Sequence, residues 1–267
     1  MKAGHITFSF GKNWGDFVEN VSDTDISRAM EDIGNWLGAD SVRGKRVIDV
    51  GSGSGIHSLS FCRLGAESIH SFDFDPLSVE ATEKLRTQAG SPSIWTVERG
   101  SILDTDYTQA LGTFDIVYSW GVLHHTGAMW DAIGNCAKLV APGGLLWISL
   151  YAKGSRYTKD LALKKKFNAS SSIGKRWMIA RRIFRFMLSR ARHLKNPFDW
   201  NQKVGRGMNI YHDIVDWLGG LPYETASEDE VIRFARQRGF ILERVRAVAE
   251  GGCSVYVLSL TRSNDRN

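Results

Sequence analysis

Two adjacent histidines, His124 and His125, follow the apolar stretch "VYSWGVL" and precede a Thr-Gly pair. Histidine titrates near neutral pH, so one of them is a candidate to take the proton of a hydroxyl nucleophile. The competing interpretation is structural, with His124 bonded to the backbone and His125 capping the next helix. A metal site is disfavoured, because no third His, Cys or carboxylate falls at a ligand spacing. The pattern leaves the catalytic and the structural roles open.

A second polar cluster lies in the stretch "MNIYHDIVDW", at Tyr211, His212 and Asp213. His212 stands beside an acid, which makes it an alternative proton acceptor, and Tyr211 joins it among the candidate catalytic residues. A solvated first turn of a helix explains the same three residues equally well.

Glycines and an acid mark a ligand site of another kind. The stretch "VIDVGSGSG" places Gly51, Gly53 and Gly55 in a G-x-G-x-G pattern, which differs from the G-x-G-x-x-G of dinucleotide folds. No Lys or Arg lies within this turn, so its ligand need not be a phosphate. Asp73 follows about twenty residues later and can accept both hydroxyl protons of a ribose. Asp75, directly before a proline, is explained as a helix N-cap.

Alternating strands and helices must position these residues. The runs "RVIDV", "SIHSFDF", "SIWTVERG", "FDIVYSW" and "LLWISLY" alternate with helical patterns, which is typical of an α/β fold with a parallel, doubly wound sheet. The helix before the last run is expected to end at Pro142-Gly143-Gly144. "FILERVRAV" and "CSVYVLSL" predict an antiparallel hairpin at the sheet edge. In the first 45 residues, only "DTDISRAMEDIGNWLG" has a helical pattern.

Five segments in this order resemble the successive motifs of class I S-adenosylmethionine-dependent methyltransferases. They are "VIDVGSGSG", "SFDFDP", "GSILD", "FDIVYSWGVLHHTG" and "LVAPGGLLWISLY", and together they cover about residues 45–151. The His-His loop and the Pro-Gly-Gly turn are most similar to the quinone-biosynthesis (ubiquinone and menaquinone type) methyltransferases. The resemblance implies a Rossmann-like sheet, S-adenosylmethionine as cofactor and S-adenosylhomocysteine as product. Its motifs are nearly silent on the substrate.

The resemblance also implies a cofactor site built from strand ends and an N-terminal lid. The glycine turn is expected at the amino-acid end of the cofactor, Asp73 at the ribose and Phe74 at the adenine. Many relatives have Asp where this chain has Ser101, so Asp104 is a possible substitute at the adenine edge. The implied cofactor residues are Phe10, Gly11, Asn13, Trp14, Asp49, Gly51, Ser52, Gly53, Gly55, Asp73, Phe74, Ser101, Ile102, Ser119 and Trp120.

Charge divides the chain into two parts. Residues 152–207 hold sixteen Lys or Arg against two Asp, whereas the rest carries an excess of acids, although the whole chain has a net charge of +5. We therefore expect a core of residues 1–151 and 208–267, with residues 1–44 as a lid segment, and a basic helical cap at 152–207. The apolar stripe through Trp177, Phe184 and Leu188 is expected to pack on the core. The alternatives are contact of residues 175–195 with an anionic membrane, and RNA binding.

Composition favours a cytoplasmic protein, peripheral at the membrane at most. No run of apolar residues is long enough to span a bilayer, and the first residues lack a signal-peptide pattern. The three cysteines are far apart in the sequence and among apolar neighbours, as in a reducing compartment. The predicted reaction is O-methylation of a small or lipid-linked metabolite. The alternatives are an RNA methyltransferase and a non-catalytic cofactor-binding regulatory protein, and nothing indicates the oligomeric state.

Overall fold

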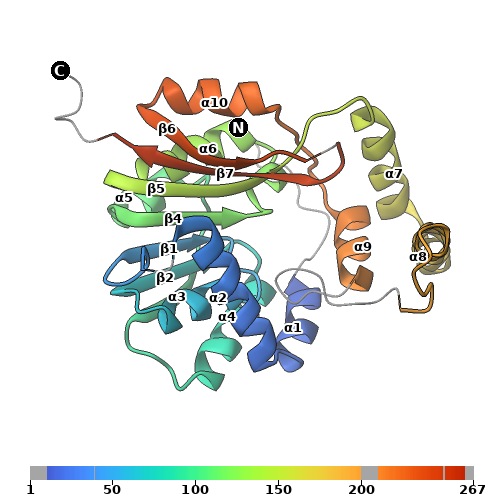
Figure 1. Ribbon diagram of the computed structural model, residues 1–267, viewed down its shortest axis with the longest axis horizontal. Coiled ribbons are helices and arrows are strands. Elements are labelled where there is room, and N and C mark those ends of the chain that lie inside the picture. Colours follow the sequence, from blue (N-terminus) through green and yellow to red (C-terminus); the bar gives the residue numbers. More distant parts are fainter. Residues whose placement is uncertain (1–10, 39, 200–209, 249, 262–267) are drawn as a thin grey trace.

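The computed structural model describes residues 11–38, 40–199, 210–248 and 250–261. Within these residues the chain forms one mixed sheet with helices on both faces, and further helices extend from one end of the sheet (Figure 1). Phe10, predicted to belong to the lid, lies outside the described residues, as do positions 200–207 of the predicted cap.

The sheet has seven strands in the order β3-β2-β1-β4-β5-β7-β6. The parallel strands are β1 (Arg46–Val50), β2 (Ser68–Asp73), β3 (Trp95–Arg99), β4 (Phe114–Trp120) and β5 (Val140–Tyr151). The antiparallel strands are β6 (Phe240–Arg246) and β7 (Cys253–Leu260). The predicted Rossmann-like fold with its antiparallel C-terminal hairpin is confirmed. Because the strand order reverses between β1 and β4, a ligand is expected at the carboxyl ends of these two strands.

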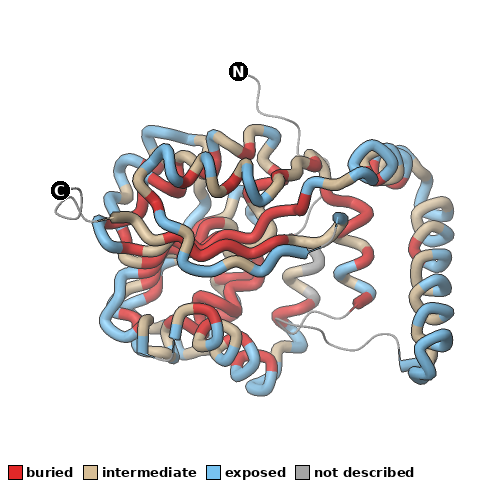
Figure 2. The backbone as a smooth tube through the Cα atoms, turned by 45° about the horizontal axis from the view of Figure 1, so that its top comes forward, coloured by how far each residue is buried: buried red, intermediate tan, exposed pale blue. Residues whose placement is uncertain are grey.

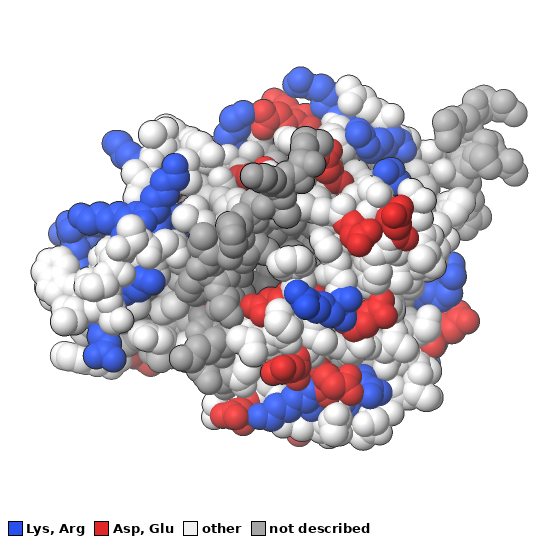
Figure 3. Space-filling model, turned by 180° about the vertical axis from the view of Figure 1, so that it is seen from behind, with Lys and Arg blue, Asp and Glu red and all other residues white. Residues whose placement is uncertain are grey.

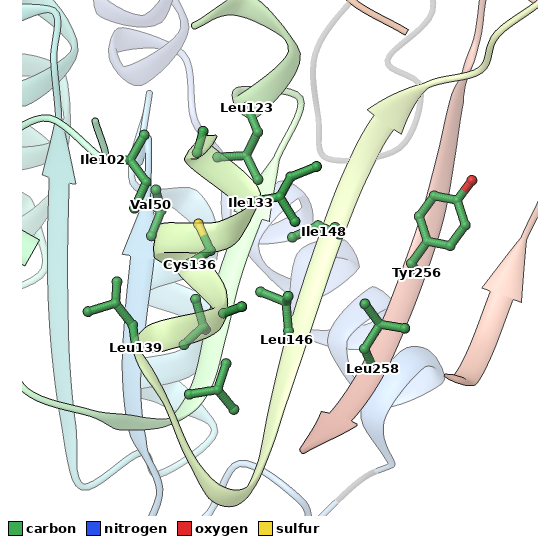
Figure 4. Close-up of a cluster of buried hydrophobic side chains, with 14 of the residues drawn as sticks. Val50, Ile102, Leu123, Ile133, Cys136, Leu139, Leu146, Ile148, Tyr256 and Leu258 are labelled. Carbon is green, nitrogen blue, oxygen red and sulfur yellow. The ribbon is translucent and has the colours of Figure 1, made fainter. Parts of the chain in front are cut away.

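Two hydrophobic cores hold the helices against the sheet. One core involves α1 (Gly11–Glu19), α2 (Asp23–Leu37), α3 (Ile56–Arg63) and α4 (Pro76–Gln88). The other involves α5 (Thr105–Ala110), α6 (Met129–Lys138) and α10 (Glu228–Arg236). Figure 4 shows how Ile133 and Cys136 of α6 face Val50, Leu146 and Ile148 of the strands in this second core.

The helix α1 corrects the expectation that the chain is irregular before α2. Phe17 and Val18 are buried in the first core, and Trp14 packs against it at the same helical spacing. The backbone N–H of Gly11 donates to Asp75 Oδ2 over 3.0 Å, which ties the start of α1 to the start of α4. This tie depends on a distant segment, so no local signal could reveal it.

The Pro-Gly-Gly turn also differs from its prediction. The helix α6 ends at Lys138, and residues 142–144 lie within β5. Val140 pairs with Phe114 and Leu145 with Ile116, so the sheet register shifts across this segment. An irregular part of a strand tolerates a proline, because a backbone N–H is not required at every position there.

Beyond β5, the helices α7 (Tyr157–Ala169) and α8 (Ser172–Arg192), which we call the cap, pack on α9 (Ile210–Gly219). The side of α8 that faces α9 carries Ile179, Ile183 and Phe186. The predicted packing of the Trp177, Phe184 and Leu188 stripe is therefore wrong, since these three side chains are exposed. Figure 2 shows α8 at the right edge as a helix of mostly exposed and half-buried residues. None of the helices in the described part of the chain is long and apolar enough to cross a membrane.

Candidate active site

A cavity of about 220 Å³ lies where β1 to β4 end, next to the first turn of α3. It occupies the switch point at which ligands of such sheets bind. Of the predicted cofactor residues, those that line it are Trp14, Asp49, Gly51, Ser52, Gly53, Phe74, Asp73, Ser101, Ile102 and Trp120. The structure thus brings most of the predicted cofactor residues to one place. Asn13 lies on α1, but its side chain is outside the described part.

The glycine turn has backbone conformations that favour glycine. Gly51 and Gly53 have φ values of +78° and +57°. A Cβ on Gly51 would lie 2.5 Å from the side chain of Val122, and one on Gly53 would lie 3.0 Å from the Trp14 ring. These glycines therefore let the loop after β4 and the helix α1 close in around the turn. Gly55 precedes α3 and does not line the cavity.

Asp73 ends β2 with both carboxylate oxygens bonded to the backbone. Oδ2 accepts from the Gly53 N–H over 3.1 Å, and Oδ1 accepts from the Asp75 N–H over 3.0 Å. Each carboxylate oxygen has a second lone pair, so the group can accept further hydrogen bonds from a ligand. Burial raises its pKa to about 6. Asp75 caps α4 by accepting from the Leu77 N–H, as its place before a proline predicted.

The cavity is acidic. Asp49 is buried and accepts a 2.5 Å hydrogen bond from the Ser58 hydroxyl, while burial and the nearby charge of Asp73 raise its pKa to about 7. Among the described residues that line the cavity, three are Asp and none is Lys or Arg. Such a lining favours a cationic ligand and disfavours one rich in phosphate.

Aromatic rings form another part of the wall. Two of them, His57 and Tyr118, were not predicted from the sequence. His57 stacks on Tyr118 with 5.0 Å between ring centroids, and on Trp120 with 6.5 Å. Tyr118 and Trp120 are two residues apart on β4 and so share one face of the strand. That alternation was a usable signal for Tyr118, whereas His57 sits in the first turn of α3, where no pattern marked it.

Three residues that the sequence analysis considered for the cofactor do not line the cavity: Ser119, Asp104 and Gly11. Ser119 points to the other face of β4, where its hydroxyl donates to the Val50 carbonyl over 2.9 Å, and it does not line the cavity. Asp104 caps α5 by accepting from the Asp106 and Tyr107 N–H groups. The Asp104 carboxylate therefore binds the start of α5 and lies outside the cavity lining. Gly11 also does not line it, because its backbone lies against Leu77.

Of the two adjacent histidines, only His125 lines the cavity. Its Nδ1 donates to the Pro222 carbonyl over 2.6 Å, so in the neutral ring the unprotonated nitrogen is Nε2. Burial lowers its pKa to about 3, which keeps the ring neutral at physiological pH. His125 does not cap α6, since Glu224 accepts from the first N–H of that helix, on Met129.

His124 has the structural role that was one of its two interpretations. Its Nδ1 accepts from the backbone N–H of Tyr151 over 3.2 Å, and its ring lies 4.0 Å from the Tyr151 ring. Burial, with the nearby His125 and Lys164, holds its pKa well below the ordinary value. The side chain thus joins the loop after β4 to the end of β5.

The cap contacts the segment that holds His125 in place. Lys164 Nζ of α7 donates to the Trp217 carbonyl, and Asn168 Nδ2 donates to the Gly219 carbonyl over 2.9 Å. The next residue, Gly220, lies against His125: a Cβ there would be 2.6 Å from the imidazole Cε1. Residues 217–222, which we call the positioning turn, therefore connect α7 with the His125 ring.

Lys164 is buried among aromatic rings. Its ammonium nitrogen lies 4.5 Å from the ring centroid of Trp217 and 4.6 Å from that of Tyr223. Burial, together with the positive charge of Arg182, lowers its pKa to about 7. No sequence pattern distinguished this lysine from its neighbours in "LKKKF".

Tyr211 and His212 lie in the first turn of α9 and do not line the cavity. Tyr211 is exposed, and the apolar residues of α9 that face inward are Ile210, Ile214, Trp217 and Leu218. The geometry favours the interpretation of a solvated helical turn. In the ranges that the structure describes, no three His, Cys, Asp or Glu side chains are grouped as a metal site would require.

Known proteins resemble this chain in sequence. Ubiquinone biosynthesis O-methyltransferases from a Caulobacter strain and from Proteus mirabilis are 32% identical over 126 residues and 35% identical over 113 residues. These matches cover 46% and 42% of this chain and 46% and 44% of the relatives. The matched part therefore spans less than half of the length of each relative. A tRNA U34 carboxymethyltransferase from Methylococcus capsulatus is 34% identical over 103 residues, which are 39% of this chain and 31% of that one.

The fold also resembles solved structures. Magnesium protoporphyrin IX methyltransferase from Synechocystis PCC 6803, solved with S-adenosylhomocysteine bound, superposes with a TM-score of 0.57 and 16% identity over 95% of each chain. A family model described as a methyltransferase domain matches residues 22–198. Because this match covers well over half of the chain, the protein belongs to the methyltransferase-domain family, as its five motifs predicted.

Proposed function

We propose that the chain transfers a methyl group from S-adenosylmethionine to a hydroxyl oxygen of a small or lipid-linked metabolite. The observation that carries this proposal is the acidic cavity at the switch point, in which three Asp and no Lys or Arg line the described wall. S-adenosylmethionine bears a sulfonium and an ammonium but no phosphate, so this lining suits it. The aromatic rings of Trp120 and Tyr118 add faces that attract a sulfonium cation.

Each part of the cofactor has a matching part of the wall. The turn at Gly51–Gly53 has no side chain at positions 51 and 53, so the amino-acid end can approach its backbone closely, and Asp73 has lone pairs left for the ribose hydroxyls. Phe74 and Ile102 offer apolar surface to the adenine. The Synechocystis structure of the same fold was solved with S-adenosylhomocysteine bound, which supports the choice of cofactor.

The cofactor supplies an activated methyl group, and the chain supplies alignment. In an in-line displacement, the new C–O bond forms as the C–S bond breaks, and the hydroxyl proton must leave. His125 lines the cavity with Nε2 as its acceptor nitrogen, so it can accept a hydrogen bond from the attacking hydroxyl and then take its proton. With a pKa of about 3, the His125 ring stays neutral at physiological pH and is a weak base. We therefore assign it chiefly to orienting the hydroxyl.

The names of the ubiquinone-pathway relatives support an oxygen acceptor, whereas the tRNA relative and the basic cap support RNA as the alternative substrate. The sequence "SWGV" at the end of β4 differs from the Asn-Pro-Pro-Tyr type of tetrapeptide found in enzymes that methylate base nitrogens. This difference favours the metabolite over RNA.

Turnover with methyl-labelled S-adenosylmethionine tests the proposal. The protein is incubated separately with a polar metabolite extract, a lipid extract and total RNA. We expect label in one of the first two fractions, with the carbon shift of an O-methyl group by NMR. Label confined to RNA would establish the alternative substrate. Cofactor binding without label in any fraction would establish a non-catalytic binding protein.

A further inference from the structure

The outer side of the cap carries a row of large apolar side chains. Ile173, Trp177, Phe184 and Leu188 are 79%, 68%, 60% and 42% exposed. Their spacing of four, seven and four residues places them on one side of α8, which we call the outer face. Contiguous exposed apolar surface of this kind marks an interaction site more often than chance exposure does.

The outer face is not needed to hold α8 on the protein. The opposite side of the helix packs with Ile179, Ile183 and Phe186 in the cluster beneath the cap. There Arg182 lies 3.8 Å above the ring of Trp217. The helix is thus apolar on two opposite sides, and only the inner side has a partner in the described structure.

The charged side chains of α8 around the outer face are all positive. The sequence of α8 contains seven Lys or Arg and no Asp or Glu. On a helical projection, Arg181, Arg185 and Arg192 border one side of the apolar row and Arg176 borders the other. Figure 3 shows Lys and Arg side chains gathered around uncharged surface at the left, where the cap lies. The complementary partner is therefore anionic.

We propose that the outer face of α8 binds the surface of an anionic lipid bilayer, with the helix lying parallel to that surface. Four apolar side chains, among them a Trp and a Phe, suit burial at the boundary between headgroups and acyl chains, and the flanking arginines suit anionic headgroups. Nucleic acid would pair with the arginines but would leave Ile173 and Leu188 in water. A second copy would bring two cationic helices together.

Vesicle sedimentation tests the surface without cofactor or substrate, so its result does not depend on methyl transfer. The full chain is mixed with vesicles of phosphatidylcholine alone or with about one third phosphatidylglycerol. The variants are Trp177→Ser with Phe184→Ser for the apolar row, and Arg181→Glu with Arg185→Glu for the charges. The matched controls are Ile241→Ser on β6 and Arg236→Glu on α10, which replace exposed residues of the same kinds elsewhere.

We expect the wild type to sediment with the anionic vesicles and not with the neutral ones. Each double variant should bind at least tenfold more weakly, while both controls bind as the wild type does. The replaced side chains are exposed, so circular dichroism and Tm should remain unchanged. Equal binding by all variants, or no preference for anionic vesicles, would overturn the proposal. A second pair of results would also overturn it. If the wild type does not bind vesicles, and the variants lose RNA binding or lose a dimer seen by sedimentation velocity, the outer face binds RNA or a second copy instead.

Discussion

Asp73 and His125 show how one physical cause acts on two side chains of opposite charge. Burial disfavours the ionised form of each, so it raises the pKa of Asp73 to about 6 and lowers that of His125 to about 3. At pH 7 the carboxylate is charged and the imidazole is neutral. A charged acceptor for ribose hydroxyls and a neutral acceptor for a substrate hydroxyl are the two states that the proposed reaction requires.

Replacement of Asp73 by Asn should weaken S-adenosylmethionine binding about tenfold or more, because hydrogen bonds to a charged acceptor are lost. In the wild type, affinity should fall as the pH is lowered from 8 to 5, since the carboxylate takes up a proton near pH 6. Asp73→Asn should show a smaller dependence, because of the Asp49 and Asp73 carboxyl groups of the cavity only Asp49 then titrates in this range. Calorimetry measures both effects, with Asp104→Asn, at an α5 cap outside the cavity, as the control. Unchanged affinity in Asp73→Asn would refute the ribose role.

Replacement of His125 by Ala should lower kcat about a hundredfold, because the hydrogen bond that orients the hydroxyl is lost together with a weak proton acceptor, and leave the cofactor Kd nearly unchanged. His212→Ala should keep wild-type turnover, because His212 does not line the cavity. Steady-state kinetics with labelled cofactor compares the two variants. If His212→Ala loses turnover and His125→Ala keeps it, the role belongs to α9. The wild-type rate should show no inflection near pH 6.5 from His125, since its pKa lies far lower.

At the scale of elements, the positioning turn and the cap determine where His125 points. Strand ends could be predicted from sequence because apolar runs and glycines mark them locally. Asp73, Trp120 and His125, which were expected at these ends, do line the cavity. Contacts between segments far apart in the chain have no comparable local sequence signal. The positioning turn is nearly a hundred residues from His125 in the chain, and its link to Lys164 depends on a buried cation that no pattern identifies.

Gly220→Ala should displace the imidazole of His125, because the added Cβ would lie 2.6 Å from its Cε1. We expect kcat to fall about tenfold or more from this misalignment, with cofactor affinity retained. Gly34→Ala is the matched control, since nothing lies within 4 Å of a Cβ there and alanine favours the helix. Steady-state kinetics measures kcat, and calorimetry measures the affinity for the cofactor. A wild-type kcat in Gly220→Ala would mean that catalysis does not require the His125 imidazole to be held in this position.

Lys164→Met should change how stability depends on pH. The pKa of Lys164 is about 7 in the folded chain against an ordinary 10.5, so between these values the unfolded chain binds more protons. The contribution of Lys164 to the free energy of unfolding therefore rises with pH through this window and is lowest below pH 7. The Tm of the wild type minus that of Lys164→Met should increase from pH 7 to pH 9.5. A constant difference would mean that Lys164 titrates normally.

The whole molecule separates an acidic cavity from a basic cap. The excess of Lys and Arg in residues 152–207 was visible in the sequence, and so was the lack of any Lys or Arg in the glycine turn. The sequence did not show which side of α8 faces the protein. The helix has apolar residues on two sides, and only tertiary packing determines which of them is buried. The same limit applied to α1, whose contacts with α4 are long-range.

The most direct measurement of the central claim is calorimetric titration of the purified chain with S-adenosylmethionine and, in parallel, with NAD. Among the described residues, the wall is acidic and has no Lys or Arg, so we expect S-adenosylmethionine to bind at one site and to be displaced by S-adenosylhomocysteine. We expect no measurable affinity for NAD. Binding of NAD in preference to S-adenosylmethionine, or no binding of S-adenosylmethionine, would contradict the account.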